Sequence, residues 1–480
     1  MMLLFWGMAW GATLELVPGD DLVGLSESLQ PGDELVLADG LYQVREQIVW
    51  SVLSTEDAPL TMRPAEGAAP VIELIPNEKG TYDNDILQIE DSSWVVVEGI
   101  TFQGSVDWTD DTENHRGVQI VNSSHVTLSG VTIMQTGDHS LYLAGTNSNI
   151  TVQDSHIHST LSGYGVYVGC SDASCWTSDS RLTNNWIHSI GGESSWSVYL
   201  AHGSQGITLS DNVIYGSAGY GVYMGSTEYG DRNIFEGNAV WGLSGYGLYV
   251  QGGARIRNNI LFNIDGTGIY SRDPERGTYS DIIISFNTVA QTTGWATLLE
   301  DWYEQFGMVL ANNAICNPTG YGLYYEMPTI DTATPVSDNV VTSNVACGLV
   351  DGIDEFPDAM TPGAGYADFV DVETWDFYPA SSDSILVGTA DPAGDTYVPE
   401  VDFNGLVRDG DTPEVGAYEW SGTGNPGWAI QEGFKEFGEG REVIEETVGG
   451  GCCQDDGSGS AALLLTPLIA VGALRRRRRR

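Results

Sequence analysis

The chain has 480 residues, of which 41% are hydrophobic and 60 are glycine, and its formal net charge at pH 7 is −47. A protein this acidic repels polyanions unless cations bridge the two, so we expect no nucleic-acid partner. The acidity has two readings: it serves solubility or salt adaptation, or it reflects bound Ca²⁺, the one cofactor we consider.

The first twelve residues, MMLLFWGMAWGA, form a short apolar run that ends in small residues. Ala9-Trp10-Gly11 fits a cleavage site of the small-x-small kind, although no basic residue precedes the run. We therefore expect a signal peptide over residues 1–12 and an exported protein. In an exported protein Cys170 and Cys175 are predicted to form a disulfide, while Cys316 and Cys347 could pair or simply be buried.

The segment that follows shows a family resemblance. LQPGDELVLADGLYQVREQIVW and then APLTMRPAEGAAPVIEL, within residues 29–74, resemble the opening coil of secreted, pectin-lyase-like β-helix proteins such as polysaccharide lyases. The resemblance implies an N-terminal cap and first coil over residues 13–60. It is specific for the fold and says little about activity, because lyases, hydrolases, epimerases and adhesins share this scaffold.

A seven-residue phrase then recurs every 21 to 32 residues. Its fourth and sixth positions are mostly aliphatic and its fifth is Tyr in all copies but one, which predicts a strand with the even positions buried. The copies are DHSLYLA (138–144), GYGVYVG (163–169), SWSVYLA (195–201), GYGVYMG (219–225), GYGLYVQ (245–251), GTGIYSR (266–272), GWATLLE (294–300) and GYGLYYE (320–326).

A second phrase, built on asparagine and preceded by a third short strand, lies between these copies. Three short strands per turn of about 20–30 residues, joined by Gly and Asn turns, describe a right-handed parallel β-helix. We assign this all-β fold to residues 61–345 and expect the stacked asparagines to bond one another and the turn backbone, which explains them without a function. They are Asn185, Asn212, Asn238, Asn259, Asn287 and Asn313.

The C-terminal part divides into three predicted segments. DFNGLVRDGDTPEVGAYEW (402–420) is similar to the closing motif of bacterial choice-of-anchor β-helix proteins, which implies a closing segment over 346–420. Residues 421–451 are rich in Gly and acid and suggest a linker. Residues 452–480 combine Cys452-Cys453, a short apolar run with a proline, and six arginines.

This tail is too short for a permanent membrane span. The order of its parts resembles the C-terminal sorting tags of myxobacteria and their relatives, the MYXO-CTERM type. The resemblance implies processing at Cys452 or Cys453, attachment to the cell surface or outer membrane, and release as an alternative; an ordinary tail anchor stays open. We expect a monomer.

The tyrosines of the repeat are predicted to form a column on the outer face, with rings one rung (~4.8 Å) apart. Such a ladder offers a flat platform for sugar rings, or it stabilises the sheet by stacking or lies under loops. The residues predicted to bind a polysaccharide are Tyr167, Tyr199, His202, Tyr223, Tyr249, Gln251, Tyr270 and Tyr324.

The seventh position of the phrase changes along the chain from small residues to charged ones. This indicates a groove with charged, potentially reactive side chains at one end. Like charges one rung apart at that end need a proton, a cation or an arginine between them. A plain Arg272–Glu300 salt bridge on a solvated surface is the alternative. The candidate catalytic residues are Arg272, Asp273, Glu300, Asp301 and Glu326.

The choice between an enzyme and a binding protein stays open. Two carboxyl groups at such a site would suit a glycoside hydrolase, whereas a lyase needs a base next to a neutralised carboxylate. Many β-helix lyases resembled here use Lys or Arg as that base, but the repeats contain no lysine. The sequence favours a surface protein that binds polysaccharide, with a polysaccharide hydrolase or lyase as the alternative.

Two further clusters could bind metal ions. The loop 107–117 gathers acidic residues around His115 but lacks the spacing of a known calcium loop, which favours a solvated loop. His156 and His158 lie one coil before His188, and the alignment puts His158 and His188 in register. Stacked structural histidines are the alternative to a metal site.

Overall fold

The computed structural model describes the chain at residues 11–76, 85–104, 115–170, 172, 174–225, 231–273, 279–326, 339–353, 356, 358–392, 397–408, 410–422 and 424–436. All of these residues belong to one unit that extends to Arg441. Among them no helix is long and apolar enough to cross a membrane.

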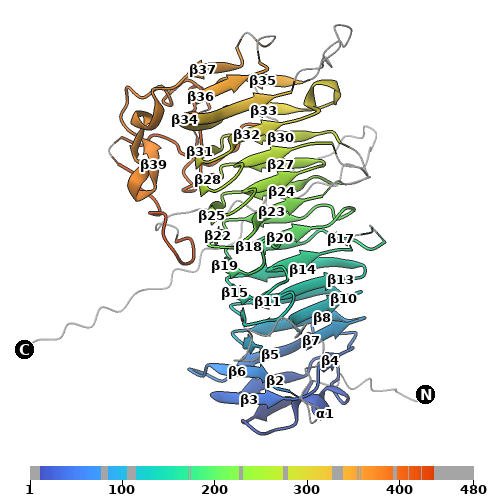
Figure 1. Cartoon of the computed structure of the whole chain (residues 1–480). Coiled ribbons are helices and arrows are strands. Elements are labelled where there is room, and N and C mark those ends of the chain that lie inside the picture. Colours follow the sequence, from blue (N-terminus) through green and yellow to red (C-terminus); the bar gives the residue numbers. More distant parts are fainter. Residues whose placement is uncertain are drawn as a thin grey trace, which may run out of the picture. The chain divides into compact units, whose positions relative to one another are not determined.

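The predicted fold class is confirmed: the unit is an all-β, right-handed parallel β-helix with three strands in most coils (Figure 1). At its N-terminal end the short helix α1 (Leu22–Ser26) lies beside the first coils and contacts β4 (Ile48–Trp50). The helix begins at Asp21, whose carboxylate accepts a hydrogen bond from the Gly24 amide, a common N-cap arrangement.

Equivalent strands of successive coils pair in parallel and form three columns. The first column consists of β4, β7 (Asp85–Glu90), β10 (Arg116–Val121), β13 (Leu141–Ala144), β16 (Val166–Val168), β20 (Trp196–Leu200), β23 (Tyr220–Met224), β26 (Leu248–Val250), β29 (Ile269–Ser271), β32 (Trp295–Leu299) and the end of β34 (Ala314–Tyr325).

The second column is the 14-stranded sheet. It consists of β1 (Thr13–Leu16), β2 (Glu34–Leu37), β5 (Leu60–Pro64), β8 (Ser93–Glu98), β11 (Ser124–Ser129), β14 (Asn147–Gln153), β18 (Arg181–Thr183), β21 (Thr208–Ser210), β24 (Asn233–Glu236), β27 (Ala254–Arg257), β30 (Ile282–Ser285), β33 (Val309–Ala311) and β35 (Val340–Thr342), with β17 (Thr177–Ser178) beside β14.

The third column completes each coil. It consists of β3 (Gly40–Val44), β6 (Pro70–Leu74), β9 (Thr101–Gln103), β12 (Thr132–Met134), β15 (His156–Thr160), β19 (Trp186–Ile190), β22 (Val213–Tyr215), β25 (Ala239–Leu243), β28 (Ile260–Ile264), β31 (Thr288–Thr292), the start of β34, β36 (Asn344–Asp351) and β37 (Met360–Pro362).

The interior of the coils is apolar. The fourth and sixth positions of the repeat point into it, for example Val222 and Met224 on β23, and both are buried. One coil cannot bury its own apolar side, so stacking supplies the core.

A column of asparagines runs through the turn between the second and third columns. From Asn212 on, the Oδ1 atom of each accepts hydrogen bonds from the backbone N–H and the Nδ2 of the asparagine one coil earlier, at 2.9–3.0 Å. Oδ1 of Asn185, the first of the column, accepts from the Ser155 amide. The asparagine at Asn344, which the sequence pattern did not include, extends the column by one coil. The predicted stacking is therefore confirmed, and we call these seven residues the asparagine ladder.

The chain turns sharply just before each ladder asparagine. The preceding residue has a positive φ, as at Asn184 (51°), Asp211 (58°) and Asn312 (59°). Asn, Asp and Gly tolerate this left-handed conformation best, which explains the NN, DN and GN pairs of the sequence.

The C-terminal part folds back along the third column. After the 3₁₀ helices η2 (Gly365–Asp368) and η3 (Val372–Thr374) and the hairpin of β38 (Phe369–Asp371) and β39 (Asp376–Pro379), the chain runs along the outer side of β19 to β31 (Figure 1). It buries a second apolar cluster there, which includes Trp241, Phe262 and Phe377.

Two polar anchors hold this segment. The guanidinium of Arg408, in the closing motif, is buried and donates to Asn258 and to the carbonyl oxygen of Gly416. The guanidinium also donates to the carbonyl oxygen of Glu414. Burial is the main cause, and the neighbouring Glu419 the next, that raises the pKa of the Glu414 carboxyl to about 9.

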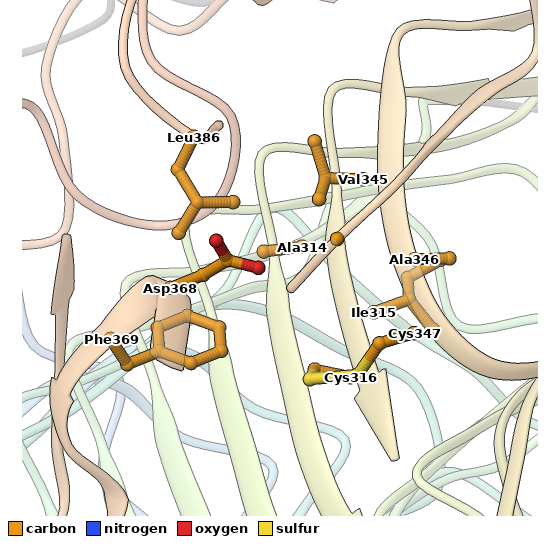
Figure 2. Close-up of a pocket in the computed structure, with 10 residues that line it drawn as sticks. Ala314, Ile315, Cys316, Val345, Ala346, Cys347, Asp368, Phe369 and Leu386 are labelled. Atoms are coloured by element: carbon orange, nitrogen blue, oxygen red, sulfur yellow. A yellow bond between two sulfur atoms is a disulfide. The ribbon is translucent and has the colours of Figure 1, made fainter. Parts of the chain in front are cut away.

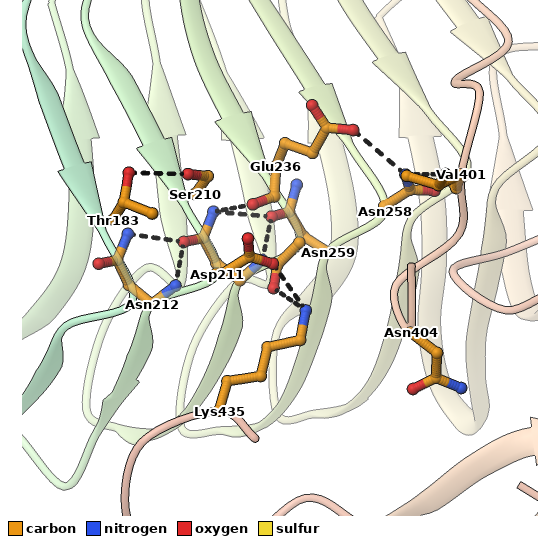
Figure 3. Close-up of polar contacts among 12 residues, drawn as sticks. Thr183, Ser210, Asp211, Asn212, Glu236, Asn258, Asn259, Val401, Asn404 and Lys435 are labelled. Carbon is orange, nitrogen blue, oxygen red and sulfur yellow. Dashed lines mark hydrogen bonds and ion pairs between the residues drawn. The ribbon is translucent and has the colours of Figure 1, made fainter. Parts of the chain in front are cut away.

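The second anchor is Lys435, of which only 2% is exposed. Its ammonium donates to Asp211 at 2.9 Å and to the carbonyl oxygen of Gly237 at 2.8 Å (Figure 3). It also lies over the ring of Phe403. Composition suggests a linker from residue 421 on, but in the described part, up to residue 436, the chain is packed on the β-helix.

The described part of the chain contains two disulfides. Cys170 bonds to Cys175, as predicted, and Cys316 bonds to Cys347. The second pair joins neighbouring coils, because the two cysteines are in register on β34 and β36. Of the two arrangements that the sequence left open for this pair, the structure has the disulfide.

Candidate functional site

The predicted tyrosine column exists and keeps its register. Successive strands of the first column align each tyrosine with the next, and neighbouring rings from Tyr142 to Tyr270 have centroids 4.4–5.4 Å apart. Leu298 then takes the place of a tyrosine, and Tyr324 follows. We call this set the tyrosine ladder; its members are Tyr142, Tyr167, Tyr199, Tyr223, Tyr249, Tyr270 and Tyr324.

A second line of aromatic rings runs beside the tyrosine ladder. Its members come from the second position of the repeat, and we call them the outer aromatic line. They stack on each other, as Trp196 does on Tyr220 at 4.5 Å, and on the ladder, as Tyr164 does on Tyr199 at 5.2 Å. The sequence carries the signal, since seven of the eight copies have an aromatic residue at that position: His139, Tyr164, Trp196, Tyr220, Tyr246, Trp295 and Tyr321.

Exposure differs between these two lines. Tyr167, Tyr223 and Tyr270 are only 6–7% exposed, because their neighbours cover their faces. The expectation of an open, flat tyrosine platform is therefore wrong for these three, and stacking accounts for their burial. The outer aromatic line is half-buried at most positions, with Trp196 9% and Tyr321 47% exposed, so any ligand would meet both lines together.

Hydrogen bonds link the hydroxyl groups of the ladder to polar neighbours. The hydroxyl of Tyr223 donates to Oε1 of Gln251 at 2.6 Å and lies 3.0 Å from Nε2 of His202. Nε2 of Gln251 donates to the hydroxyl of Tyr249 at 2.7 Å. Three residues predicted for binding thus form one network around Tyr223.

Burial makes these phenols still weaker acids than a free tyrosine, whose pKa is near 10. It raises the pKa of Tyr249 to about 12. Burial is also the largest cause that raises the pKa of Tyr223 and of Tyr270 above the usual value. The ladder therefore presents hydroxyl groups, and no phenolate charge, at neutral pH.

The seventh position of the repeat changes character as predicted. Ala144, Gly169, Ala201 and Gly225 are buried at the earlier coils, and Gln251 is buried among the hydroxyls. At the next coil Arg272 is exposed.

The charged residues do come together at the later coils. The hydroxyl of Tyr270 donates to Glu300 at 2.6 Å, and its hydrogen bond to Arg272 raises the pKa of that guanidinium. The Asp301 amide donates to Glu326 at 3.1 Å, and the Asp273 amide donates to Asp301 at 3.4 Å.

The Arg272–Glu300 salt bridge considered from the sequence is absent from the ion pairs of the described residues; both side chains meet the hydroxyl of Tyr270 instead. Desolvation, and then the charge of Asp301, raises the pKa of Asp273 above its usual value. A carboxyl that holds its proton more tightly beside another carboxylate is suited to proton transfer.

A narrow crevice lies elsewhere, under the closing segment (Figure 2). It is lined mostly by apolar side chains such as Phe369, together with the Cys316–Cys347 disulfide and Asp368. The crevice leaves no room for even a water-sized sphere. Ligand pockets commonly measure ~300–1,000 Å³, so this crevice does not hold an oligosaccharide.

The three histidines singled out in the sequence lie together on the third column. His158 and His188 are in register and stacked at 5.1 Å, and Nε2 of His156 lies 2.7 Å from Nε2 of His188. Burial is the largest cause that lowers the pKa of His156 to about 3 and that of His188 to about 4.

Several predictions fall outside the described residues. They are the signal peptide except its last two residues, the acidic part of the loop 107–117, and the tag with Cys452 and Cys453. In that loop only residues 115–117 are described, and His115 is buried.

The fold and the aromatic face of the first column together define a class of protein. It is a β-helix in which one column of strands carries rows of aromatic rings and, at one end, charged side chains. The family described as right-handed β-helix region matches residues 81–199 and 196–352. The chain belongs to this family.

The chain is similar to several solved structures. The A-module of the Azotobacter vinelandii mannuronan C-5 epimerase AlgE6 is 13% identical over 71% of this chain and 93% of that one, with a TM-score of 0.53. Pectate lyase Pel9A is 12% identical over 86% and 97%, with a TM-score of 0.49. An alginate lyase from Paenibacillus sp. str. FPU-7 is 14% identical over 71% and 99%, with a TM-score of 0.40. No curated protein matches the chain.

Proposed function

We propose that this protein binds a polysaccharide along the first column, where the tyrosine ladder and the outer aromatic line lie side by side. The observation that carries the proposal is the continuity of this face: neighbouring rings are in contact, stacked or edge to face, at every step from Tyr142 to Tyr270. A repeating aromatic face suits a repeating ligand, because apolar faces of sugar rings pack on aromatic rings at every rung.

Polar groups on the same face supply the directional contacts that such a site needs. The amide of Gln251 and the hydroxyls of Tyr223 and Tyr249 form one hydrogen-bond network. The similar epimerase module is named for mannuronan, which is a polysaccharide, but that likeness is one of fold alone. The net charge of −47 favours a neutral glycan over an anionic one.

The test is affinity electrophoresis of the full chain through gels that contain one polysaccharide each, neutral or uronic, with and without Ca²⁺. We expect retardation in at least one gel and a loss of most of it in Tyr220→Ala and Tyr246→Ala, which remove accessible rings of the outer aromatic line. Trp94→Asn is the matched control. Trp94 stacks on His125 in the second column, and its φ of 55° suits Asn.

Retardation that is equal in Tyr220→Ala and in the wild type would show that the aromatic face does not bind the glycan. Retardation in none of the gels would contradict glycan binding as a whole.

A second function, cleavage of a polysaccharide, is favoured by one observation. The charged end brings Asp273, with its raised pKa, next to Asp301, and Glu300 next to the hydroxyl of Tyr270. The same panel of polysaccharides tests it through reducing ends and unsaturated products. Loss of cleavage in Glu300→Gln and Glu326→Gln would assign catalysis to this end, and products without unsaturation would indicate a hydrolase.

Export and surface attachment are part of the proposal and rest on sequence alone. Residues 1–12 would direct export, and processing at Cys452 or Cys453 would attach a monomer to the cell surface or release it. Cell fractionation of the wild type and of a variant with Cys452→Ser and Cys453→Ser tests this. An unchanged distribution between cells and medium would contradict the role of the cysteines.

A further inference from the structure

A cluster of three histidines on the third column is separate from the aromatic face. His156 and His158 lie on β15, two residues apart, so both point to the same side of the strand. His188 lies on β19 in register with His158. One ring nitrogen from each residue falls within 4.8 Å of those of the other two. We propose that these three imidazoles bind one divalent transition-metal ion of the Zn²⁺ or Cu²⁺ kind.

Hydrogen-bond contacts at Nδ1 orient two of the rings. Nδ1 of His158 lies 2.9 Å from Oγ of Ser159, and Nδ1 of His188 lies 2.8 Å from Oγ of Ser189. Each contact occupies Nδ1, so Nε2 is the nitrogen of that ring that would face a metal ion. Nε2 of His188 contacts Nε2 of His156, and a bound ion would replace that contact. Metal-binding histidines commonly have such a partner on the other ring nitrogen, and it fixes both the tautomer and the orientation of the ring.

The two serines are held in place by the backbone. Ser159 and Ser189 have φ values of 57° and 55°, at equivalent positions of successive coils. The same local turn therefore repeats beside both rings. A packed row of histidines needs no such matched pair of hydroxyl contacts, whereas a metal site gains from it.

The spacing of the nitrogens is close to what a metal ion needs. Zn–N bonds of about 2.0–2.1 Å in a tetrahedral site put two ligand nitrogens roughly 3.3 Å apart. The Nε2 atoms of His156 and His188 are 2.7 Å apart, and rotation of the side chains would separate them enough for an ion. The ring of His156 stacks on Trp186 at 3.9 Å, which holds one side of the cluster.

The chemistry of the donors selects the metal. Imidazole suits Zn²⁺ and Cu²⁺, whereas Ca²⁺ and Mg²⁺ take oxygen ligands, so this cluster would not bind Ca²⁺. Three protein ligands leave at least one coordination position for water or another ligand. The net charge of −47 raises the local concentration of cations around the protein.

The test is a titration of the full chain, without a polyhistidine tag, with Zn²⁺, Cu²⁺ or Ca²⁺ alone. Cys452→Ser and Cys453→Ser are introduced throughout so that thiols do not compete. We expect one equivalent of Zn²⁺ or Cu²⁺ to bind and Ca²⁺ not to bind here. The electron paramagnetic resonance spectrum of the Cu²⁺ form should show coupling to nitrogen nuclei.

Two variants and a control locate the site. His188→Gln removes a ligand and should lower the affinity at least tenfold. Ser189→Gly keeps the left-handed backbone, removes the hydroxyl partner, and should lower the affinity about 10–100-fold. His125→Asn, in the second column at a φ of 54°, should leave the affinity unchanged.

Binding of one equivalent that both variants weaken and the control keeps would support the site. Absence of Zn²⁺ and Cu²⁺ binding to the wild type would overturn it, as would equal affinity in the wild type, His188→Gln and Ser189→Gly. In either case the three rings are only a stacked surface. Because glycan binding is measured on another column, this outcome leaves the proposed function untouched.

Discussion

The asparagine ladder and the tyrosine ladder are built by the same coils, yet they differ in burial and in regularity. The asparagine ladder is buried and unbroken from Asn185 to Asn344. The tyrosine ladder is partly exposed and is interrupted at Leu298. A buried asparagine that is replaced leaves its neighbours without hydrogen bonds, whereas a half-exposed ring can change. Burial therefore separates a column that the fold requires from one that is free to serve a ligand.

Of the variants that test this difference between the two ladders, Asn259→Ala should have the largest effect on stability. Oδ1 of Asn259 accepts from the amide and from Nδ2 of Asn238, and its own Nδ2 donates to the carbonyl oxygen of Phe235. The substitution leaves two or three buried polar groups unpaired at roughly 1–3 kcal/mol each. We expect the free energy of unfolding, measured in urea, to fall by about 2–5 kcal/mol.

Asn263→Gly is the control for this variant, since Asn263 is exposed on β28, the strand that directly follows Asn259, and has a φ of 49° that Gly adopts freely. Its effect should stay within about 0.5 kcal/mol. Similar losses in Asn259→Ala and Asn263→Gly would mean that the ladder does not stabilise the fold in the way argued here.

The two ladders also show how far the sequence goes. Period-two alternation around the tyrosines and the spacing of the asparagines predict the strands, the coil and the register, because stacking forces equivalent residues to be neighbours. The sequence pattern did not predict Asn344 as a member of the asparagine ladder, because the residues around it match the repeat poorly. It did not predict the outer aromatic line either, although seven of the eight copies have an aromatic residue at the second position.

Some features cannot be read from a repeat at all. The burial of Tyr223 depends on how its neighbours' rings tilt over it, and spacing alone does not define that. The packing of Lys435 against Asp211 joins residues more than 200 positions apart in a segment that composition marks as a linker. The pairing of Glu300 with the hydroxyl of Tyr270, and not with Arg272, depends on side-chain geometry.

The second prediction compares a buried tyrosine of the ladder with an exposed one of the outer aromatic line. Tyr223→Phe keeps the ring and removes the hydroxyl that donates to the buried Gln251. We expect a loss of roughly 1–2 kcal/mol in the free energy of unfolding, because the amide oxygen then lacks its donor. Tyr321→Phe, at an exposed ring, should change stability by less than about 0.5 kcal/mol. Equal effects of both variants would contradict a special role for the buried network.

The third prediction uses pH, to which only the tyrosine ladder responds, since asparagine does not titrate. The pKa of Tyr249 is raised to about 12 in the native state, while a tyrosine in the unfolded chain titrates near pH 10. Between these values the unfolded chain binds fewer protons than the native protein, so stability falls as pH rises. Urea midpoints at pH 9, 10 and 11 should fall more steeply for the wild type than for Tyr249→Phe. Parallel slopes would show that this phenol is not shifted by folding.

The smallest effect is expected from repairing the tyrosine ladder. In Leu298→Tyr the new ring would stand in register between Tyr270 and Tyr324. Cross-strand aromatic pairs contribute about 0.2–1 kcal/mol, so thermal unfolding should show a gain in that range. Leu298→Met, which keeps the volume, should change neither stability nor glycan binding.

The same variant separates the two uses of the ladder. If the face binds a glycan along its whole length, closing the gap at Leu298 joins Tyr270 to Tyr324 and should raise the affinity severalfold. If the rings serve only the sheet, stability rises and the affinity does not. A gain in stability without a gain in affinity would therefore place the tyrosine ladder beside the asparagine ladder, as a second column that the fold keeps for its own sake.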